Sequence, residues 1–170
     1  MNVEKIEKLE EIVPLDENQT IIEHQVKRLT AAGENYGSLM LSVDITVQNS
    51  YGTEEIHTVA KMVPPNDFIQ KVFNTQTTFK NEIAFYNNIV PVLHEFQREQ
   101  GMNELVDFSP KYYGGRINLS GDPSVVDSDA VLLLENLKTA GYKNFERTLG
   151  FDLDTSKLIV ADLAHLHAVP

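Results

Sequence analysis

The sequence predicts an α+β fold in which an antiparallel sheet is followed by a long helix. Period-two alternation of apolar residues over 39–47 indicates a half-buried strand. The apolar positions that would share one face of this strand are Leu39, Leu41, Val43, Ile45 and Val47. A second apolar run over 56–63 and an apolar seam with three- and four-residue spacing over 72–90 predict a second strand and the helix.

The composition is that of a folded chain, with 42% apolar and 23% charged residues among 170. A formal net charge of −11 argues against nucleic acid or an anionic membrane as a partner. The chain has no cysteine, which excludes disulfides and cysteine-based zinc sites and fits a reducing compartment. No signal-peptide pattern or membrane-spanning apolar run is present. We therefore expect a cytoplasmic protein.

The first two elements precede the alternating strand. Residues 1–18 are acidic, and an apolar residue recurs at helical spacing among the glutamates, which predicts a short amphipathic helix that ends near Pro14. These apolar residues are Val3, Ile6 and Leu9. Residues 20–29 have a strand-like pattern. Strict alternation would place Ile21 on one face of this strand. The opposite face would then carry Ile22, His24, Val26 and Arg28.

The strand over 56–63 carries a single lysine. Residues 49–52, Asn-Ser-Tyr-Gly, predict a turn that leads into it. Alternation places Ile56, Thr58 and Ala60 on one face. The other face would carry His57, Val59 and Lys61. Pro64 and Pro65 end the strand.

A long helix follows, with Asn66 or Asp67 as its N-cap. Glu82 would lie on the flank of its seam, on the side that packs against the sheet. The seam residues are Val72, Gln76, Phe79, Ile83, Tyr86 and Val90. Pro91 cannot continue this helix without the loss of a hydrogen bond, but it suits the first turn of a second helix over 91–100 that ends at Gly101.

The remaining chain predicts two more strands and a closing helix. The strands cover 111–118 and 130–134, with a turn over 120–123. Asp154 or Thr155 would cap the closing helix, whose apolar positions are Leu158, Ala161, Leu163, Ala164 and Leu166. These elements suggest three regions: an N-terminal helix and lead-in over 1–18, a main unit over 19–137, and a further segment over 138–170.

Two features of the main unit could contact phosphates. The loop over 33–38 contains two glycines and a serine, which allow close backbone approach and expose N–H groups. Glu34 counts against a phosphate loop, and an ordinary hairpin turn is the alternative. Lys61 lies in an otherwise apolar strand, where an unpaired ammonium is costly to bury. It is either a snorkelling or edge lysine, or a phosphate ligand oriented by Glu82. In the second case we expect the two side chains to face each other between sheet and helix.

Two further stretches bear on chemistry. Residues 130–137 are a buried strand that runs into a polar break, which is either a strand with a turn or a hinge whose backbone would pair with an adenine edge. His165 and His167 are two residues apart on a predicted helix, about 200° around its axis, so they cannot share one metal ion. We expect no metal site in these 170 residues.

Together, six stretches in this order resemble the ecdysteroid kinase-like proteins of insects, a family of small-molecule kinases allied to choline and aminoglycoside kinases with the protein-kinase-like fold. The stretches are GENYGS (33–38), VAKMVPP (59–65), FKNEIAFYNNIVP (79–91), LLLENL (132–137), GYKNFER (141–147) and LAHLHA (163–168). The resemblance implies a small lobe and hinge over 19–137 and only the start of a helical large lobe after it.

The resemblance also implies roles for individual residues. Lys61 would contact the phosphates of ATP, and Glu82 would be its ion-pair partner. The phosphate-covering loop would include Gly33, Asn35, Gly37 and Ser38, and the adenine hinge would include Leu134, Glu135 and Leu137. The complete enzyme would use Mg²⁺ and phosphorylate a small-molecule alcohol such as an ecdysteroid.

One departure from the family pattern concerns catalysis. The family's catalytic loop carries a His-Gly-Asp element, a later Asn and a metal-binding Asp, all expected after the helix that ends at Ala168. Neither His165 nor His167 begins a His-x-Asp sequence. We therefore expect no catalytic residue in these 170 residues. The chain would then be either a truncated part of a kinase or a non-catalytic binding or regulatory module. An acidic α+β interaction domain unrelated to kinases is the third hypothesis.

Overall fold

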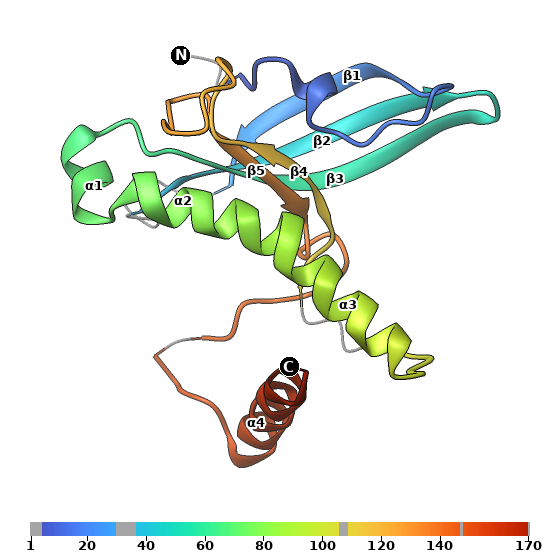
Figure 1. Ribbon diagram of the computed structural model, residues 1–170, viewed down its shortest axis with the longest axis vertical. Coiled ribbons are helices and arrows are strands. Elements are labelled where there is room, and N and C mark those ends of the chain that lie inside the picture. Colours follow the sequence, from blue (N-terminus) through green and yellow to red (C-terminus); the bar gives the residue numbers. More distant parts are fainter. Residues whose placement is uncertain (1–4, 30–36, 106–108, 147, 170) are drawn as a thin grey trace.

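A computed structural model describes residues 5–29, 37–105, 109–146 and 148–169 (Figure 1). In this part of the chain, five strands form one antiparallel sheet with the order β1-β2-β3-β5-β4. The strands are β1 (Thr20–Arg28), β2 (Leu39–Asn49), β3 (Gly52–Met62), β4 (Tyr112–Arg116) and β5 (Val131–Glu135). The predicted combination of an antiparallel sheet with helices is confirmed.

The β2–β3 hairpin is the longest pairing in the sheet and ends in the predicted turn. Asn49 pairs with Gly52, and the Asn49 side chain accepts a hydrogen bond of 2.8 Å from the Tyr51 N–H. Alternate residues of β2 are buried with at most 1% exposure, as their spacing predicted. These residues are Leu41, Val43, Ile45 and Val47.

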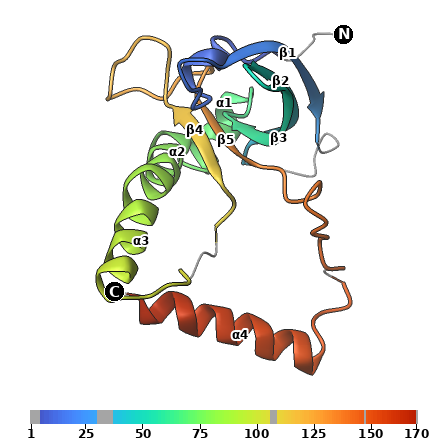
Figure 2. The same ribbon diagram turned by 90° about the vertical axis from the view of Figure 1, so that its right-hand side faces the viewer.

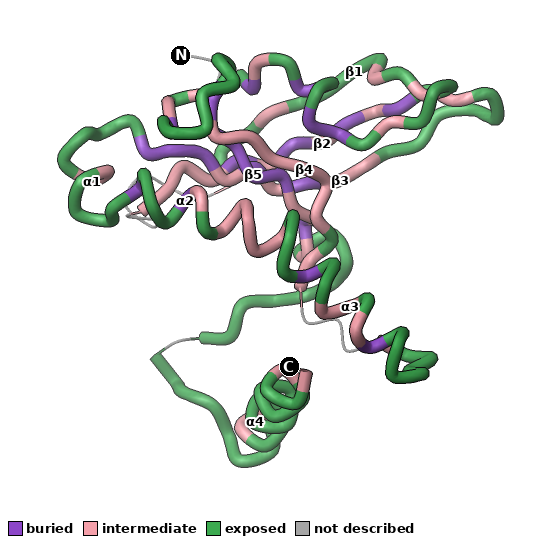
Figure 3. Tube along the Cα trace, viewed as in Figure 1, coloured by how far each residue is buried: buried purple, intermediate pink, exposed green. Residues whose placement is uncertain are grey.

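The N-terminal segment covers this buried face of the sheet. It contains a three-residue 3₁₀ helix, η1 (Leu9–Glu11), where the sequence predicted an amphipathic helix up to Pro14. Lys8 has a left-handed conformation with φ of 49°, which prevents a continuous α-helix, and Val3 lies outside the described residues. The apolar residues of the segment nevertheless enter the core, namely Ile6, Leu9, Ile12 and Val13 (Figure 3).

Gly114 in β4 allows this segment to approach the sheet. A Cβ atom at Gly114 would lie 2.1 Å from the Ile12 carbonyl oxygen, and its φ of 155° is rare for other residues. The N-terminal segment is therefore part of the folded unit, because strand and segment touch through their main chains.

β1 departs from the strict alternation that its sequence predicted. A β-bulge between Ile21 and Glu23 shifts the register, so that Ile21 pairs with Val47 and packs against the core. Ile22 is instead 55% exposed. The extra residue of a bulge reverses the face that each preceding side chain occupies, which is why Ile21 and Val26 share the core face.

The predicted long helix consists of two α-helices with a break between them. Asn66 caps α1 (Asp67–Val72), as expected, by accepting a hydrogen bond of 3.1 Å from the Ile69 N–H. α2 (Thr75–Ala84) begins after Asn74, whose left-handed φ of 47° ends the first helix. Val72 is therefore 60% exposed and does not belong to the seam.

A second helix begins beside Pro91, as predicted, and Pro91 lies in its first turn. A π-helical segment, η2 (Phe85–Ile89), joins α2 to α3 (Val90–Glu99), and the three form one long rod (Figure 1). Wider π turns leave backbone groups without their usual partners, which accommodates the missing N–H of Pro91 at the start of α3. α3 ends just before Gly101, as predicted, where φ is 77°.

α2 packs on the second face of the sheet. Phe79 is 4% exposed and lies in a cluster with the β5 residue Leu132, while Ile83 and Tyr86 are half-buried beside it. The same cluster contains Val126 from the loop over 117–129 that connects β4 and β5. The sheet is thus covered by the N-terminal segment on one face and by α2 on the other.

The last helix, α4 (Leu153–Ala168), lies apart from the sheet in both views (Figure 1 and Figure 2). Its cap is Asp152, two residues before the predicted Asp154, and the Asp152 carboxylate accepts a hydrogen bond of 2.7 Å from the Thr155 N–H. No α4 residue is buried. None of the helices in the described ranges is both long and apolar enough to span a membrane.

Candidate nucleotide site

An ion pair between Lys61 and Glu82 lies at the junction of β3 and α2. The Lys61 Nζ and the Glu82 Oε2 are 2.5 Å apart, and their side chains are 28% and 32% exposed. The sequence predicted that these side chains would face each other, and the contact is present. Ala60 and Met62, on either side of Lys61, point into the opposite core, as alternation requires.

Packing of α2 accounts for the position of Glu82. Phe79, three residues earlier, is buried in the cluster that contains Leu132. Leu132 is the direct β5 partner of Lys61, so the buried turn of α2 lies beside the strand position that carries the lysine. Residues three apart on a helix are neighbours, and Glu82 therefore faces the sheet.

A cavity of about 320 Å³ adjoins the predicted hinge. Val59 lines it from β3 and pairs in register with Leu134 of β5, which also lines it. Val59 is two residues before Lys61, so both side chains lie on the same sheet face. The other lining residues are Leu29, Met40, Pro110, Glu135, Asn136, Leu137, Lys138 and Asn144.

Hydrogen bonds occupy several main-chain groups of the predicted hinge. The Glu135 N–H donates to the Lys111 carbonyl at 2.8 Å, and the Glu135 carboxylate accepts from the Lys111 N–H at 3.3 Å. The Asn136 N–H donates to the His57 carbonyl at 3.0 Å. Within the described part of the chain, the Leu137 N–H has no hydrogen-bond partner. Among the N–H groups of 135–137 in the predicted hinge, it is the one without a partner in the described residues.

Sequence reasoning missed several residues of the cavity wall. Asn136 is 5% exposed and stabilises the hinge, because its side-chain oxygen accepts from the Lys138 N–H at 3.2 Å and its carbonyl accepts from the Thr139 hydroxyl at 2.7 Å. An Asn between Glu135 and Leu137, directly after a strand, was a signal for such a turn. Leu29 and Pro110 carried no signal, since only the fold brings them to this cavity.

Half of the residues expected in the phosphate loop can be placed. Gly33 and Asn35 lie outside the described residues. A Cβ atom at Gly37 would lie 3.1 Å from the ring of Phe73, so this glycine permits a close approach between the end of the loop and the α1–α2 junction. The Ser38 hydroxyl contacts the Met40 sulfur at 3.6 Å. A contact of these residues with phosphates stays a prediction.

Two tyrosines adjoin the ion pair. Burial, and to a lesser degree the negative charge of Glu82, raises the pKa of Tyr86. Burial also raises the pKa of Tyr112, whose ring stacks on that of Tyr86 with centroids 5.8 Å apart. Both hydroxyls therefore stay protonated at neutral pH, and neither adds negative charge beside Lys61.

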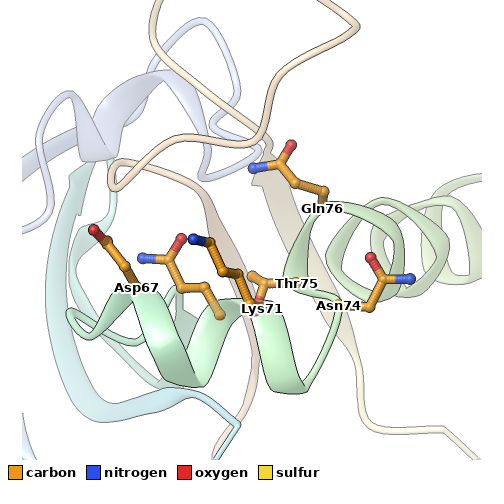
Figure 4. A pocket seen from close by; sticks show the side chains of 6 residues that line it. Asp67, Lys71, Asn74, Thr75 and Gln76 are labelled. Carbon is orange, nitrogen blue, oxygen red and sulfur yellow. The ribbon is translucent and has the colours of Figure 1, made fainter.

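Two other pockets lie away from this ion pair. One, of about 420 Å³, is lined by polar residues at the α1–α2 junction, including Asp67, Lys71 and Thr75 (Figure 4). The other, of about 210 Å³, lies over β1–β3 around Asp44 and His57, which are 2.7 Å apart. In the ranges that the structure describes, no group of three or more His, Asp or Glu side chains could hold a metal ion.

The antiparallel sheet, the helix on one of its faces and the β3–α2 ion pair define a kinase-like small lobe. The sequence pattern of the ecdysteroid kinase-like family matches residues 32–170, and the chain belongs to that family. No curated protein and no solved structure gives a match. The N-terminal segment with Ile6 and Leu9 precedes the matched range although it forms part of the core.

Proposed function

We propose that this chain is the nucleotide-binding part of an ATP-dependent kinase that phosphorylates a hydroxyl group of a small molecule. The observation that carries the proposal is the Lys61–Glu82 ion pair on the same sheet face as the cavity beside residues 134–137. In kinases a strand lysine paired with a helix glutamate contacts the α- and β-phosphates. The family match supports the same reaction class.

The base of the nucleotide would occupy the cavity. Val59 and Leu134 give it apolar walls, and the free Leu137 N–H would donate to a ring nitrogen of adenine. Ligand sites of this kind are mostly apolar with a few polar groups that fix orientation. The Glu135 side chain accepts a hydrogen bond from the Lys111 N–H, so main-chain groups and not this carboxylate would bind the base.

The phosphates would extend from the cavity toward Lys61. The loop that covers them would consist of Gly33, Asn35, Gly37 and Ser38. Mg²⁺ bound with ATP would neutralise phosphate charge. The acceptor would be a small-molecule alcohol such as an ecdysteroid, for which the family description is the support. We place the reaction in the cytoplasm, which the absence of cysteine supports.

A non-catalytic nucleotide-binding module is the second candidate function. It shares the nucleotide site but not the phosphoryl transfer, for which kinases use an aspartate that takes the proton from the acceptor hydroxyl. Both candidates require the same nucleotide site.

Titration of the 170-residue chain with a fluorescent ATP analogue and Mg²⁺ tests the site. We expect weak binding that is competed by ATP and lost in Lys61→Met, because the methionine keeps the side-chain bulk without the charge. Lys27→Met is the matched control, since Lys27 is a strand lysine on the same sheet face with a 65% exposed side chain. Equal binding by the Lys61→Met and unaltered chains would overturn the proposal.

A further inference from the structure

Two hydrogen bonds tie the start of α2 to the loop that connects β4 and β5. The Gln76 Nε2 donates to the Val126 carbonyl at 2.6 Å, and the Val126 N–H donates to the Gln76 Oε1 at 2.9 Å. Figure 4 shows Gln76 at the start of α2, where it lines a pocket together with Asp67 and Lys71 of α1. One side-chain amide thus binds both main-chain groups of a residue 50 positions away.

The loop that receives Gln76 is itself held in one conformation. Asn118, 7% exposed, donates to the carbonyls of Asp122 and Val125 at 2.5 and 2.6 Å. Its side-chain oxygen accepts from the Gly121 N–H at 2.7 Å. Hydrogen bonds from Ser124 lower the pKa of Asp122, so this carboxylate stays charged and bonded at neutral pH. The loop is therefore a preformed support.

Further contacts continue along α2 toward the ion pair. The Lys80 Nζ donates to the Ser124 carbonyl at 2.5 Å, and Val126 is buried in the same cluster as Phe79. Left-handed Asn74 separates α2 from α1, so the two helices are not one continuous rod. The loop over 117–129 therefore holds the start of α2, in addition to the packing of Phe79 against the sheet.

We propose that Gln76 is a positioning residue of the nucleotide site, which anchors α2 to this loop so that Glu82 faces Lys61. Helix and sheet surfaces can slide or rotate by small amounts, and a charge-assisted hydrogen bond is lost after a displacement of about 1 Å. The Gln76–Val126 bonds oppose such a displacement. The consequence for ATP binding rests on the function proposed above, whereas the effect on the ion pair does not.

The ion pair can be followed without any nucleotide. Lys61 in the unliganded chain is labelled with an amine-acylating reagent, and the labelling rate at each lysine is measured by mass spectrometry. A lysine held by a carboxylate is a poor nucleophile, so Glu82→Gln sets the rate for the broken pair. We expect Gln76→Ala to raise Lys61 labelling by at least about threefold, because loss of two neutral hydrogen bonds frees the start of α2. Other lysines should label at unchanged rates.

Gln70→Ala is the matched control. Gln70 lies on α1, and its side chain also donates to a main-chain carbonyl, but to that of Pro64 at 2.9 Å and not to one of the loop. Gln76→Asn is a second test variant, since it keeps the amide but is too short to reach both groups of Val126. Circular dichroism establishes that each variant is folded at the labelling temperature.

The outcomes separate the two proposals. If Gln76→Ala and Gln76→Asn label Lys61 as slowly as Gln70→Ala does, Gln76 does not position the pair and the inference is overturned, whatever the nucleotide result. If both raise Lys61 labelling while the unaltered chain binds no ATP analogue, the positioning role stands and the proposed function fails. If the chain binds nucleotide, we expect Gln76→Ala to raise the Kd on the order of fivefold, with Gln70→Ala unchanged.

Discussion

Lys61 and Glu82 are 21 residues apart in sequence and meet at 2.5 Å across the junction of β3 and α2. Val59, two residues before the lysine, lines the cavity that adjoins the hinge. A single strand therefore carries a wall of the cavity and the cation of the ion pair. A displacement of α2 relative to this strand would therefore change the contact between Lys61 and Glu82.

Glu82→Gln should separate function from stability. Because both side chains of the pair are partly solvated, we expect the free energy of unfolding to fall by less than about 1 kcal/mol. Affinity for the ATP analogue should fall on the order of tenfold, because Lys61 loses the charged partner that orients it. Urea unfolding and nucleotide titration measure the two effects. A large loss of stability with unchanged affinity would make the pair a structural contact.

The bulge in β1 predicts different costs for two neighbouring isoleucines. Ile21 packs on the core and Ile22 is 55% exposed. Ile21→Ala should lower the free energy of unfolding by about 1–2 kcal/mol, whereas Ile22→Ala should change it by no more than about 0.5 kcal/mol. Urea denaturation at equal protein concentration compares them. The reverse order would indicate strict alternation without the bulge.

The 170-residue chain alone should transfer no phosphate to steroid or choline-like alcohols. Phosphoryl transfer depends on positioning and charge stabilisation, and the sequence holds no His-x-Asp element to supply a general base. Incubation with radiolabelled ATP, Mg²⁺ and each alcohol, followed by product separation, measures it. Magnesium-dependent turnover that Lys61→Met abolishes would contradict this expectation.

Hydrogen exchange should differ sharply between α4 and the sheet. α4 has no buried residue, and several of its apolar side chains are exposed, including Leu158 at 68% and Val160 at 64%. We expect residues 154–168 to exchange far faster than β2 and α2 in the monomeric chain, because their hydrogen bonds open without loss of core packing. Mass spectrometry of peptic fragments resolves the regions. Equal protection would mean that α4 packs on the rest of the chain in solution.

The cap of α4 should be sensitive to acid. The hydrogen bond from the Thr155 N–H lowers the pKa of Asp152 below its usual range. A lowered folded-state pKa means that the cap stabilises α4 above the ordinary value of about 3.9 and is lost as pH falls through the folded value. Cα chemical shifts of 153–168 should therefore move toward coil values in acid.

Asp152→Asn provides the control for this titration. Its amide oxygen can cap the helix without a change of charge, so the acid-dependent part of the shift should disappear. Asp152→Ala should reduce the helical shifts at neutral pH as well, because no side-chain oxygen remains to accept from Thr155. An identical pH response in Asp152→Asn would assign the effect to other carboxylates.

Local patterns in the sequence determined much of the fold. Alternation over 39–47 gave the buried face of β2, and the Asn-Ser-Tyr-Gly stretch gave the β2–β3 turn, because side-chain direction and turn chemistry depend on adjacent residues. Helical spacing predicted that Glu82 faces the sheet. Strand alternation predicted that Lys61 lies on the sheet face opposite to that of the core residue Ala60.

Other local predictions failed because a neighbouring conformation overrode the pattern. The bulge between Ile21 and Glu23 placed Ile21 on the core face with Val26. The left-handed residue Asn74 divided the expected helix. Each of these changes involves one or two residues, and a periodic pattern averages over many.

Only the tertiary structure decided which distant residues share the site. Val59 and Leu134 are partners because of the strand order: β5 pairs with β3 as well as with β4, which precedes it in the sequence. Gln76 reaches Val126 across 50 residues for the same reason, because the β4–β5 loop returns beside α2. Local sequence sets side-chain direction, whereas strand order and helix packing set which side chains meet.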